Sequence, residues 1–197
     1  MSITLLPDFL TEAEARELLA RMPERPPAPL FDRIADAVEG LGMGYCARGP
    51  RSRQSVRIEC QQHGHPWHFD GCAGTPWDPA EALQAARSYK LKPGGHEWAR
   101  LSFSLLLSDP ATFTGGELEL LTEAGEVVRV SPKLHHRTLV VWHSGLVGPG
   151  VFTPALHRVH PHQAVPGSEL LGWSHNSQGE TVRQFGGARY VLVGFLA

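Results

Sequence analysis

The sequence has few cysteines, no marked excess of charge of either sign and no long hydrophobic run. Its three cysteines, Cys46, Cys60 and Cys72, form no C-x-x-C pattern, which argues against a disulfide framework and favours a reducing, cytoplasmic compartment. Eighteen basic against twenty acidic residues give a formal net charge of -2, so there is no basic footprint for nucleic acid. No apolar run approaches the roughly 18 residues that cross a bilayer, and the N-terminus lacks the features of a signal peptide. We therefore expect a cytoplasmic protein that binds neither nucleic acid nor membrane.

At 197 residues, the chain is long enough for one domain with its own hydrophobic core. We expect a single domain over residues 1–197, with N-terminal helices at about 11–40 and a β-barrel at about 54–197. No internal repeat or low-complexity tract divides the chain. The sequence is silent on oligomeric state.

Two helices are predicted near the N-terminus. Thr11 is a suitable N-cap and Glu14 follows three residues later, which is the spacing of a capping box, so the first helix should run from there to about Met22. The second helix is predicted over residues 30–38, because Gly40 and the residues after it favour its termination.

Short apolar or alternating segments, separated by glycine and proline, dominate the rest of the chain. Residues 55–60 (SVRIEC) alternate apolar and polar side chains at the two-residue period of a half-buried strand. Further strands are predicted at 99–108, 117–121, 127–130, 138–142 and 189–196. Residues 71–95 are predicted as a connection with a helical turn or two around 79–87. The pattern predicts a mainly β protein, an antiparallel double-stranded barrel or sandwich with helices packed outside.

The segment His68-Phe69-Asp70 carries the strongest chemical signal. On a strand or strand end, residues two apart point to the same face, so His68 and Asp70 would lie together while Phe69 points away. A distal histidine, His157, would have to come from another strand packed opposite. Two imidazoles and one carboxylate on one face of an octahedron bind Fe(II) and leave positions open for a cosubstrate and O₂.

Neither the H-x-D segment nor the choice of distal histidine is unique to an iron site. A sequence with 11 histidines produces an H-x-D segment by chance, and a surface pairing of His68 with Asp70 would explain it equally well. Three further histidines could replace His157 as the distal ligand, namely His143, His160 and His162.

Longer segments resemble the 2-oxoglutarate and Fe(II)-dependent oxygenases, specifically their prolyl-4-hydroxylase-like branch. Residues 7–11 (PDFLT) are similar to the segment that precedes the first helix of such proteins. Residues 101–110 (LSFSLLLSDP) and 113–118 (FTGGEL) are similar to the most specific block of the family. Residues 157–161 (HRVHP) resemble the motif around the distal iron ligand, and residues 187–192 (GARYVL) resemble the strand whose arginine pairs with the far carboxylate of 2-oxoglutarate.

The resemblance implies a double-stranded β-helix barrel, of the jelly-roll or cupin-like kind, in which His68, Asp70 and His157 hold Fe(II) and Arg189 anchors 2-oxoglutarate. It implies an oxygenase that couples oxidative decarboxylation of 2-oxoglutarate to hydroxylation of an unactivated C–H bond. O₂ is the co-reactant, and a role for ascorbate as reductant stays open. The substrate stays open between a peptidyl residue, a free amino acid and another small metabolite, and the outcome between hydroxylation and desaturation.

One spacing departs from the family pattern. Typical members place the basic residue soon after the distal histidine, whereas His157 and Arg189 are 32 positions apart (189 − 157). We interpret residues 161–185 as an inserted loop at the barrel mouth, where loops normally set specificity. Residues 144–153 are a second lengthening at the same place. If the interpretation as an insertion fails, Arg183 is the alternative anchor.

Two other classes of protein compete with the oxygenase. A cupin-like metal-binding or sensing domain without turnover would keep the three metal ligands but lack a working cosubstrate anchor, so the role of Arg189 distinguishes it. A zinc hydrolase usually carries a glutamate base beside its ligands, as in H-E-x-x-H, and no such segment occurs here.

Overall fold

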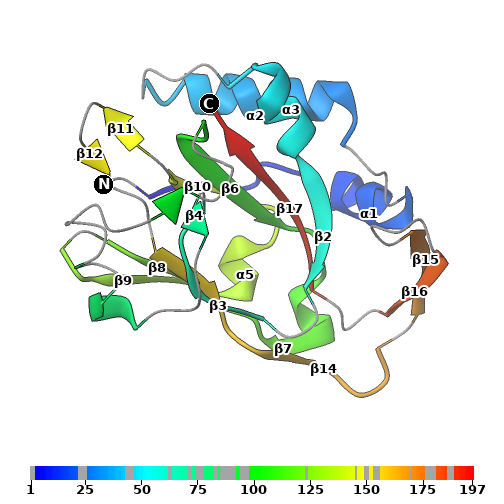
Figure 1. Ribbon diagram of the computed structural model, residues 1–197. Coiled ribbons are helices and arrows are strands. Elements are labelled where there is room, and N and C mark those ends of the chain that lie inside the picture. The colour runs from blue at the N-terminus through cyan, green and yellow to red at the C-terminus, as the bar shows by residue number, and fades with distance from the viewer. Residues whose placement is uncertain are drawn as a thin grey trace.

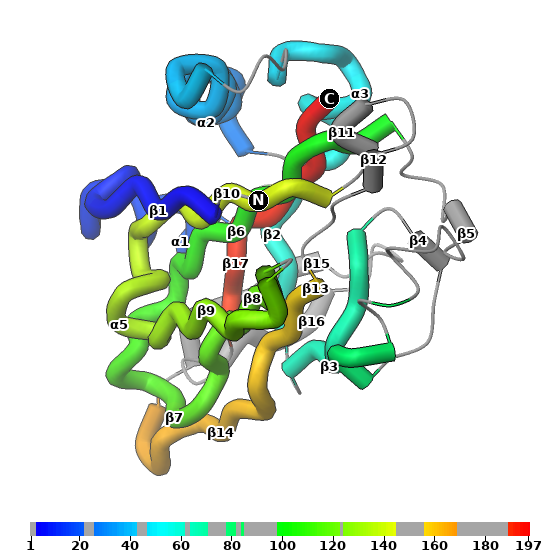
Figure 2. The backbone as a smooth tube through the Cα atoms, turned by 90° about the vertical axis from the view of Figure 1, so that its left-hand side faces the viewer, coloured from blue at the N-terminus to red at the C-terminus, as the bar shows by residue number. Residues whose placement is uncertain are grey.

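The chain is described by a computed structural model, whose elements are shown in Figure 1 and, from the side, in Figure 2. Backbone and side chains are described for residues 3–21, 26–42, 47–61, 64–70, 78–81, 84, 98–122, 124–144, 156–168 and 189–197. The backbone alone is described for residues 72–73, 92–93, 146–148, 151–152, 170–175 and 181–185.

Both predicted N-terminal helices form. Helix α1 spans Glu12–Arg21 and starts with the predicted capping box: the Glu14 N–H donates to the Thr11 hydroxyl at 3.2 Å, and the Thr11 N–H donates to the Glu14 carboxylate at 2.8 Å. Helix α2 spans Ala28–Glu39 and begins earlier than predicted. Pro29 fits there because the first turn of a helix has no partner for the N–H that proline lacks.

Three further helical segments, none of them predicted, are short. They are α3 (Pro50–Ser55), the 3₁₀ helix η1 (Pro110–Thr112) and α5 (Pro132–His135). Of the helical turn predicted around 79–87, residues 79–81 and 84 are helical, and the remainder lies outside the described residues. No helix within the described ranges has the length and apolar character needed to cross a membrane.

Five strands form an antiparallel sheet in the order β1-β10-β6-β17-β2. Their bounds are β1 Thr4–Leu6, β10 Leu139–His143, β6 Leu101–Leu106, β17 Arg189–Leu196 and β2 Arg57–Gln61. The sequence predicts all of these except β1, and β17 has the predicted bounds. We call this the large sheet.

Four strands form a second antiparallel sheet, the small sheet, in the order β3-β13-β8-β9. Their bounds are β3 His65–His68, β13 Leu156–Val159, β8 Leu118–Leu121 and β9 Val127–Val130. The turn before β8 requires glycine, because Gly115 and Gly116 have φ of 77° and 80°. A Cβ on Gly115 would also lie 2.3 Å from the carbonyl oxygen of Pro161.

Four two-stranded pairs complete the described structure: β7 (Phe113–Gly115) with β14 (His162–Ala164), β11 (Leu146–Gly148) with β12 (Val151–Phe152), β15 (Leu170–His175) with β16 (Thr181–Phe185), and β4 (Cys72–Ala73) with β5 (Lys92–Pro93). The segment 161–185 therefore contains β14 and the β15–β16 hairpin, and the lengthened segment 144–153 contains β11 and β12. The architecture is mainly antiparallel β with few helices, as predicted.

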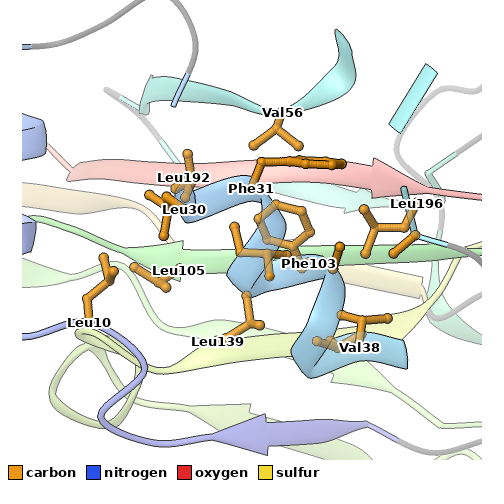
Figure 3. Close-up of a cluster of buried hydrophobic side chains, with 14 of the residues drawn as sticks. Leu10, Leu30, Phe31, Val38, Val56, Phe103, Leu105, Leu139, Leu192 and Leu196 are labelled. Atoms are coloured by element: carbon orange, nitrogen blue, oxygen red, sulfur yellow. The ribbon is translucent and has the colours of Figure 1, made fainter. Parts of the chain in front are cut away.

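The main hydrophobic core lies between α2 and the large sheet. Figure 3 shows Leu30, Phe31 and Val38 of the helix gathered with Phe103 and Leu192 of the sheet. Phe31 is 1% exposed and Phe103 is also 1% exposed. The buried positions of α2 recur at the spacing of one helical face, which explains why this side of the large sheet is covered.

Candidate active site

His68, Asp70 and His157 come together where β3 ends beside the start of β13. The two strands pair so that His157 lies opposite His68, and Asp70 follows two residues after the end of β3. His157 Nε2 lies 3.4 Å from Asp70 Oδ2, and His68 Nε2 lies 3.9 Å from Asp70 Oδ1. One donor atom from each of the three side chains lies within 4.8 Å of the others. This spacing suits a single divalent cation held by two nitrogens and one oxygen.

An irregularity in β3 orients His68. The register between β13 and β3 shifts, because His157 pairs with His68 whereas Val159 pairs with His65. Such a bulge bends its strand and redirects a side chain. His68 Nδ1 lies 2.8 Å from the carbonyl oxygen of Pro66, and since a carbonyl only accepts, Nδ1 carries the proton. His68 Nε2 therefore keeps its lone pair for a metal ion.

The surroundings of His68 favour the neutral form that metal binding needs. Burial lowers the pKa of His68 to about 4, helped by the neighbouring His157 and opposed by Asp70. The ring centroid of His65 lies 4.0 Å from that of His68. Burial lowers the pKa of His65 as well. On the other side, the ring of Trp142 lies 4.9 Å from that of His157.

The three side chains open into a cavity of about 210 Å³ between the two sheets. Strand β2 contributes Arg57, Glu59 and Gln61 to its wall, and the large sheet also contributes Ser102 and Trp142. The Ser102 hydroxyl and the Trp142 indole N–H are buried without a hydrogen-bond partner among the described residues. Buried polar groups are normally satisfied, so a polar ligand or a water molecule in the cavity would supply the partners of these two atoms.

Arg189 lies inside the protein, on the inner face of β17. Strand alternation gives it the same face as Val193, which lines the cavity. It is 0% exposed, and burial lowers its pKa to about 9, so that it remains a cation at neutral pH. Its Nε donates to the Gly116 carbonyl at 3.2 Å, its Nη1 donates to Gln61, and its Nη2 lies 3.1 Å from Nδ1 of His135. All three partners are neutral acceptors, and within the described ranges no carboxylate forms an ion pair with Arg189.

The rival histidines lie elsewhere. His160 Nε2 is 3.1 Å from the carboxylate of Glu119, and the ring of His162 contacts Phe113 edge-on at 5.7 Å. His143 pairs with Leu101 at the end of β10. No second group of metal-binding side chains occurs in the part of the chain with described side chains. For Arg183, the alternative anchor, the backbone alone is described, and it pairs with Trp173 in the β15–β16 hairpin.

The sequence interpretation missed several residues of this region. His135 is fully buried, its pKa is lowered well below the usual value by burial and by the charge of Arg189, and it accepts from that guanidinium. No local pattern marked it, because the contact joins residues far apart in the chain. Arg57, Glu59 and Gln61 had a signal, since the two-residue period of β2 places all three on one face.

A larger cavity of about 490 Å³ lies between α1 and α2 and is lined partly by Leu18, Leu30 and Arg33. It is remote in the fold from β3 and β13 and is predominantly apolar in its described lining. Among the described side chains, the group that could hold a metal ion lines the smaller cavity.

Comparisons with known proteins agree with the predicted resemblance at the level of the fold. No protein-family model and no curated protein matches the sequence. Among solved structures, the chain is similar to a prolyl-4-hydroxylase of Pseudomonas putida, with a TM-score of 0.51 and 16% identity over 98% of this chain and 84% of the other. It is also similar to a prolyl hydroxylase from Trichoplax adhaerens that was solved with a peptide fragment of a hypoxia inducible factor. There the TM-score is 0.52 and the identity 12%, over 98% of this chain and 83% of the other.

Proposed function

We propose that this protein is a non-heme iron oxygenase that couples oxidative decarboxylation of 2-oxoglutarate to hydroxylation of a C–H bond. The observation that carries the proposal is the convergence of His68, Asp70 and His157 at one point inside a prolyl-hydroxylase-like fold. Two imidazoles and one carboxylate with open positions are the ligand set of Fe(II) oxygenases. When bound, Fe(II) and 2-oxoglutarate supply the activation of O₂ and the oxidising power for the C–H bond.

The donor set fits ferrous iron. His68 and His157 offer neutral imidazole nitrogens and Asp70 offers a carboxylate oxygen, which together suit Fe(II) better than a soft metal ion that prefers thiolates. Asp70 also completes the ligand set that favours hydroxylation or desaturation over halogenation in the oxygenases that the sequence resembles. The side chains of His65 and Trp142 shield the two imidazoles and keep them from rotating away.

The inner surface also fits 2-oxoglutarate. Arg189 is a buried cation that has only neutral acceptors among the described residues, so a dicarboxylate would supply the missing opposite charge. A guanidinium can hold a carboxylate through two parallel hydrogen bonds. The unpartnered Ser102 hydroxyl and Trp142 N–H supply further donors in the cavity, which Gln61, a partner of Arg189, also lines.

We further propose that the two sheets are the walls of a double-stranded β-helix within a single domain over residues 1–197. The chain crosses from one sheet to the other between β2 and β3, β3 and β6, β6 and β8, β9 and β10, β10 and β13, and β13 and β17. This alternation is typical of jelly rolls. The proposed barrel occupies about residues 54–197, with 161–185 inserted before β17, and the proposed location is the cytoplasm.

The test is release of succinate from 2-oxoglutarate by the Fe(II)-loaded protein in air, with ascorbate present to keep the iron ferrous. We expect release that depends on both iron and 2-oxoglutarate, and that is abolished in His68→Ala and in Asp70→Ala. Release that persists at the wild-type rate in both variants would contradict the proposed site.

A metal-binding or sensing domain without turnover is the second candidate. The observation that favours it is that Gln61, Gly116 and His135 already satisfy Arg189 in the folded chain. Such a domain would bind Fe(II) through the same three side chains but show no affinity for 2-oxoglutarate. Calorimetric titration of the iron-loaded protein with 2-oxoglutarate under anaerobic conditions separates the two candidates.

A further inference from the structure

The wall of the metal cavity carries a pair of opposite charges that the proposed reaction does not use. Arg57 and Glu59 lie two residues apart on β2, and both line the cavity together with His68, Asp70 and His157. Arg57 Nη2 lies 2.5 Å from Glu59 Oε1. The strand register also places Arg57 on the cavity side of the sheet, since Arg57 pairs with the cavity-lining Val193 of β17.

Two contacts besides Glu59 position the Arg57 side chain. Its Nη1 donates to the carbonyl oxygen of Ser55 at 3.1 Å, and its guanidinium lies 5.7 Å from the ring centroid of Phe195, which also lines the cavity. The side chains of Arg57 and Glu59 are 45% and 32% exposed. An ion pair at this exposure contributes little to stability, so a ligand can replace each partner of the pair at small cost.

The other charges of the proposed loaded site cancel. The divalent ion and the Arg189 cation balance the Asp70 carboxylate and the two carboxylates of 2-oxoglutarate, while the histidines are neutral. The wall then presents Arg57 and Glu59 alone, a cation and an anion side by side with no net charge. A substrate that carries only one of the two charges pairs with only one of these side chains, whereas a substrate that carries both pairs with both.

We infer that the substrate is a free α-amino acid in its zwitterionic form, with its carboxylate bound to Arg57 and its ammonium group bound to Glu59. The inference rests on the proposed function and names the substrate class of the same cavity. The ammonium and carboxylate of an α-amino acid share one carbon atom, which matches the adjacency of the two protein charges. A capped, peptidyl residue has neither charge. The cavity of about 210 Å³ is also small compared with ordinary ligand pockets of roughly 300–1,000 Å³.

The reaction balances with the co-reactants already proposed. The substrate side chain loses one C–H bond and gains one C–OH bond. One oxygen atom of O₂ enters that hydroxyl group and the other enters succinate, while 2-oxoglutarate loses CO₂. No further oxidant or reductant is consumed in a coupled turnover.

The experiment measures succinate release by the Fe(II)-loaded full chain with each proteinogenic L-amino acid, above the release without substrate. Each amino acid is compared with its N-acetyl amide, which lacks both charges, and with its decarboxylated amine, which lacks the carboxylate. We expect at least one free amino acid to stimulate release and its two analogues to fail. No stimulation by any amino acid, or equal stimulation by the N-acetyl amide, would overturn the inference.

Variants of the charged pair make the test specific. Arg57→Gln and Glu59→Gln should each raise the KM for the amino acid about tenfold or more, as expected for the loss of a charge-assisted hydrogen bond. Arg57→Lys should recover part of the affinity. Arg21→Gln is the matched control, because it breaks an ion pair of 2.9 Å with Glu17 on the exposed surface of α1.

The absorption band of the Fe(II) and 2-oxoglutarate complex separates failure of the inference from failure of the proposed function. The band should be unchanged in Arg57→Gln. Loss of the band in Arg57→Gln would mean that Arg57 binds the cosubstrate. An unchanged KM for the amino acid would mean that the Arg57–Glu59 pair only protects the edge strand β2 from pairing with another chain. Either result overturns the inference. A wild-type protein that shows no band would reject the proposed function and the inference with it.

Discussion

The large and small sheets differ in what lies on their outer faces. The large sheet is covered by helices, and its outer face is apolar: Phe103, Leu105 and Leu192 pack with the buried side of α2. Figure 1 shows α2 and α3 beside this sheet, whereas the small sheet, with β3, β8 and β9, lies on the opposite side of the molecule. The large sheet therefore obtains its stability from the burial of apolar surface.

The outer face of the small sheet instead carries a row of charges. Glu119 on β8 is 1% exposed and accepts from Arg158 Nε and Arg129 Nε, both at 2.7 Å. The Arg158 guanidinium lies 4.7 Å from the ring centroid of Trp67 on β3. This row crosses all four strands of the sheet, which are β3, β13, β8 and β9.

The charged row alternates with the candidate metal ligands. Trp67 precedes His68 and Arg158 follows His157, so each ligand points inward beside a neighbour that points outward. We therefore propose that the large sheet and its helices stabilise the fold, and that the small sheet and the turn after β3 position the proposed metal ligands. Substitutions in the two sheets should then have separable effects.

The largest effect on activity is expected in the small sheet. His157→Ala removes one of the three proposed metal ligands, so Fe(II)-dependent succinate release should be abolished while the helix-covered core is untouched. Succinate assays together with thermal unfolding of the metal-free protein check this. Wild-type activity in this variant, or unfolding of its metal-free form, would contradict the proposal that the two sheets have separable effects.

The largest effect on stability is expected in the large sheet. Phe31→Ala leaves a cavity between α2 and the sheet and should cost about 3–5 kcal/mol in free energy of unfolding. Denaturant titration measures this loss. Under conditions where the variant is still folded, its affinity for Fe(II) should match that of the wild type, and a parallel loss of iron affinity would contradict the division.

Arg189 lies on the large sheet and donates to Gln61, which lines the cavity, so it tests whether the effects of the two sheets are separable. Arg189→Leu removes the proposed carboxylate anchor and should raise the KM for 2-oxoglutarate at least about thirtyfold, since truncating one partner of a buried charge pair costs roughly 2–5 kcal/mol. Initial rates of succinate release at varied 2-oxoglutarate check the change. An unchanged KM in a folded variant would assign Arg189 a structural role with Gln61 and His135.

A smaller effect, with a defined pH dependence, is expected for Glu119→Gln. Burial raises the pKa of Glu119, but hydrogen bonds from Arg158, His160 and Arg129 outweigh it and lower the pKa from 4.5 to about 2. The ionised carboxylate therefore stabilises the fold fully above pH 4.5, and this contribution is lost as the pH falls from 4.5 to about 2. The variant should lose roughly 1–3 kcal/mol at neutral pH, as expected when a buried hydrogen-bonded charge is removed.

Unfolding measured across that pH window checks the Glu119 prediction. The wild type should lose more stability than Glu119→Gln as the pH falls, so the two curves should converge. Arg129→Ala is the control, because the Arg129 side chain is 64% exposed and its loss leaves Arg158 on the carboxylate. Curves that stay parallel down to low pH would show that Glu119 is not held ionised by its neighbours.

The sequence predicted the local features of the fold better than its long-range contacts. The capping box of α1 and the bounds of β17 follow from short-range patterns, and both are found. The sequence also predicts that His68 and Asp70, two residues apart at a strand end, lie close together, and β3 indeed ends at His68. The sequence predicts a loop over 161–185, because glycines and polar residues hide the alternation of β14, β15 and β16.

Contacts between distant segments could not be derived from patterns. The sequence predicts His157 on a strand packed opposite, whereas β13 pairs with β3 in the same sheet, and no periodicity in the sequence specifies that pairing. His135 meets Arg189 only because α5 and β17 lie together in the folded chain. Glu119 looked like an ordinary strand residue, since its burial depends on arginines contributed by two other strands.

The decisive measurement is an anaerobic titration of the Fe(II)-loaded protein with 2-oxoglutarate, followed by visible absorption. The proposed iron site predicts a metal-to-ligand charge-transfer band that saturates at one 2-oxoglutarate per chain in the wild type and is absent in Asp70→Ala. A wild-type protein that binds iron but develops no band, or a band of full intensity in Asp70→Ala, would contradict it.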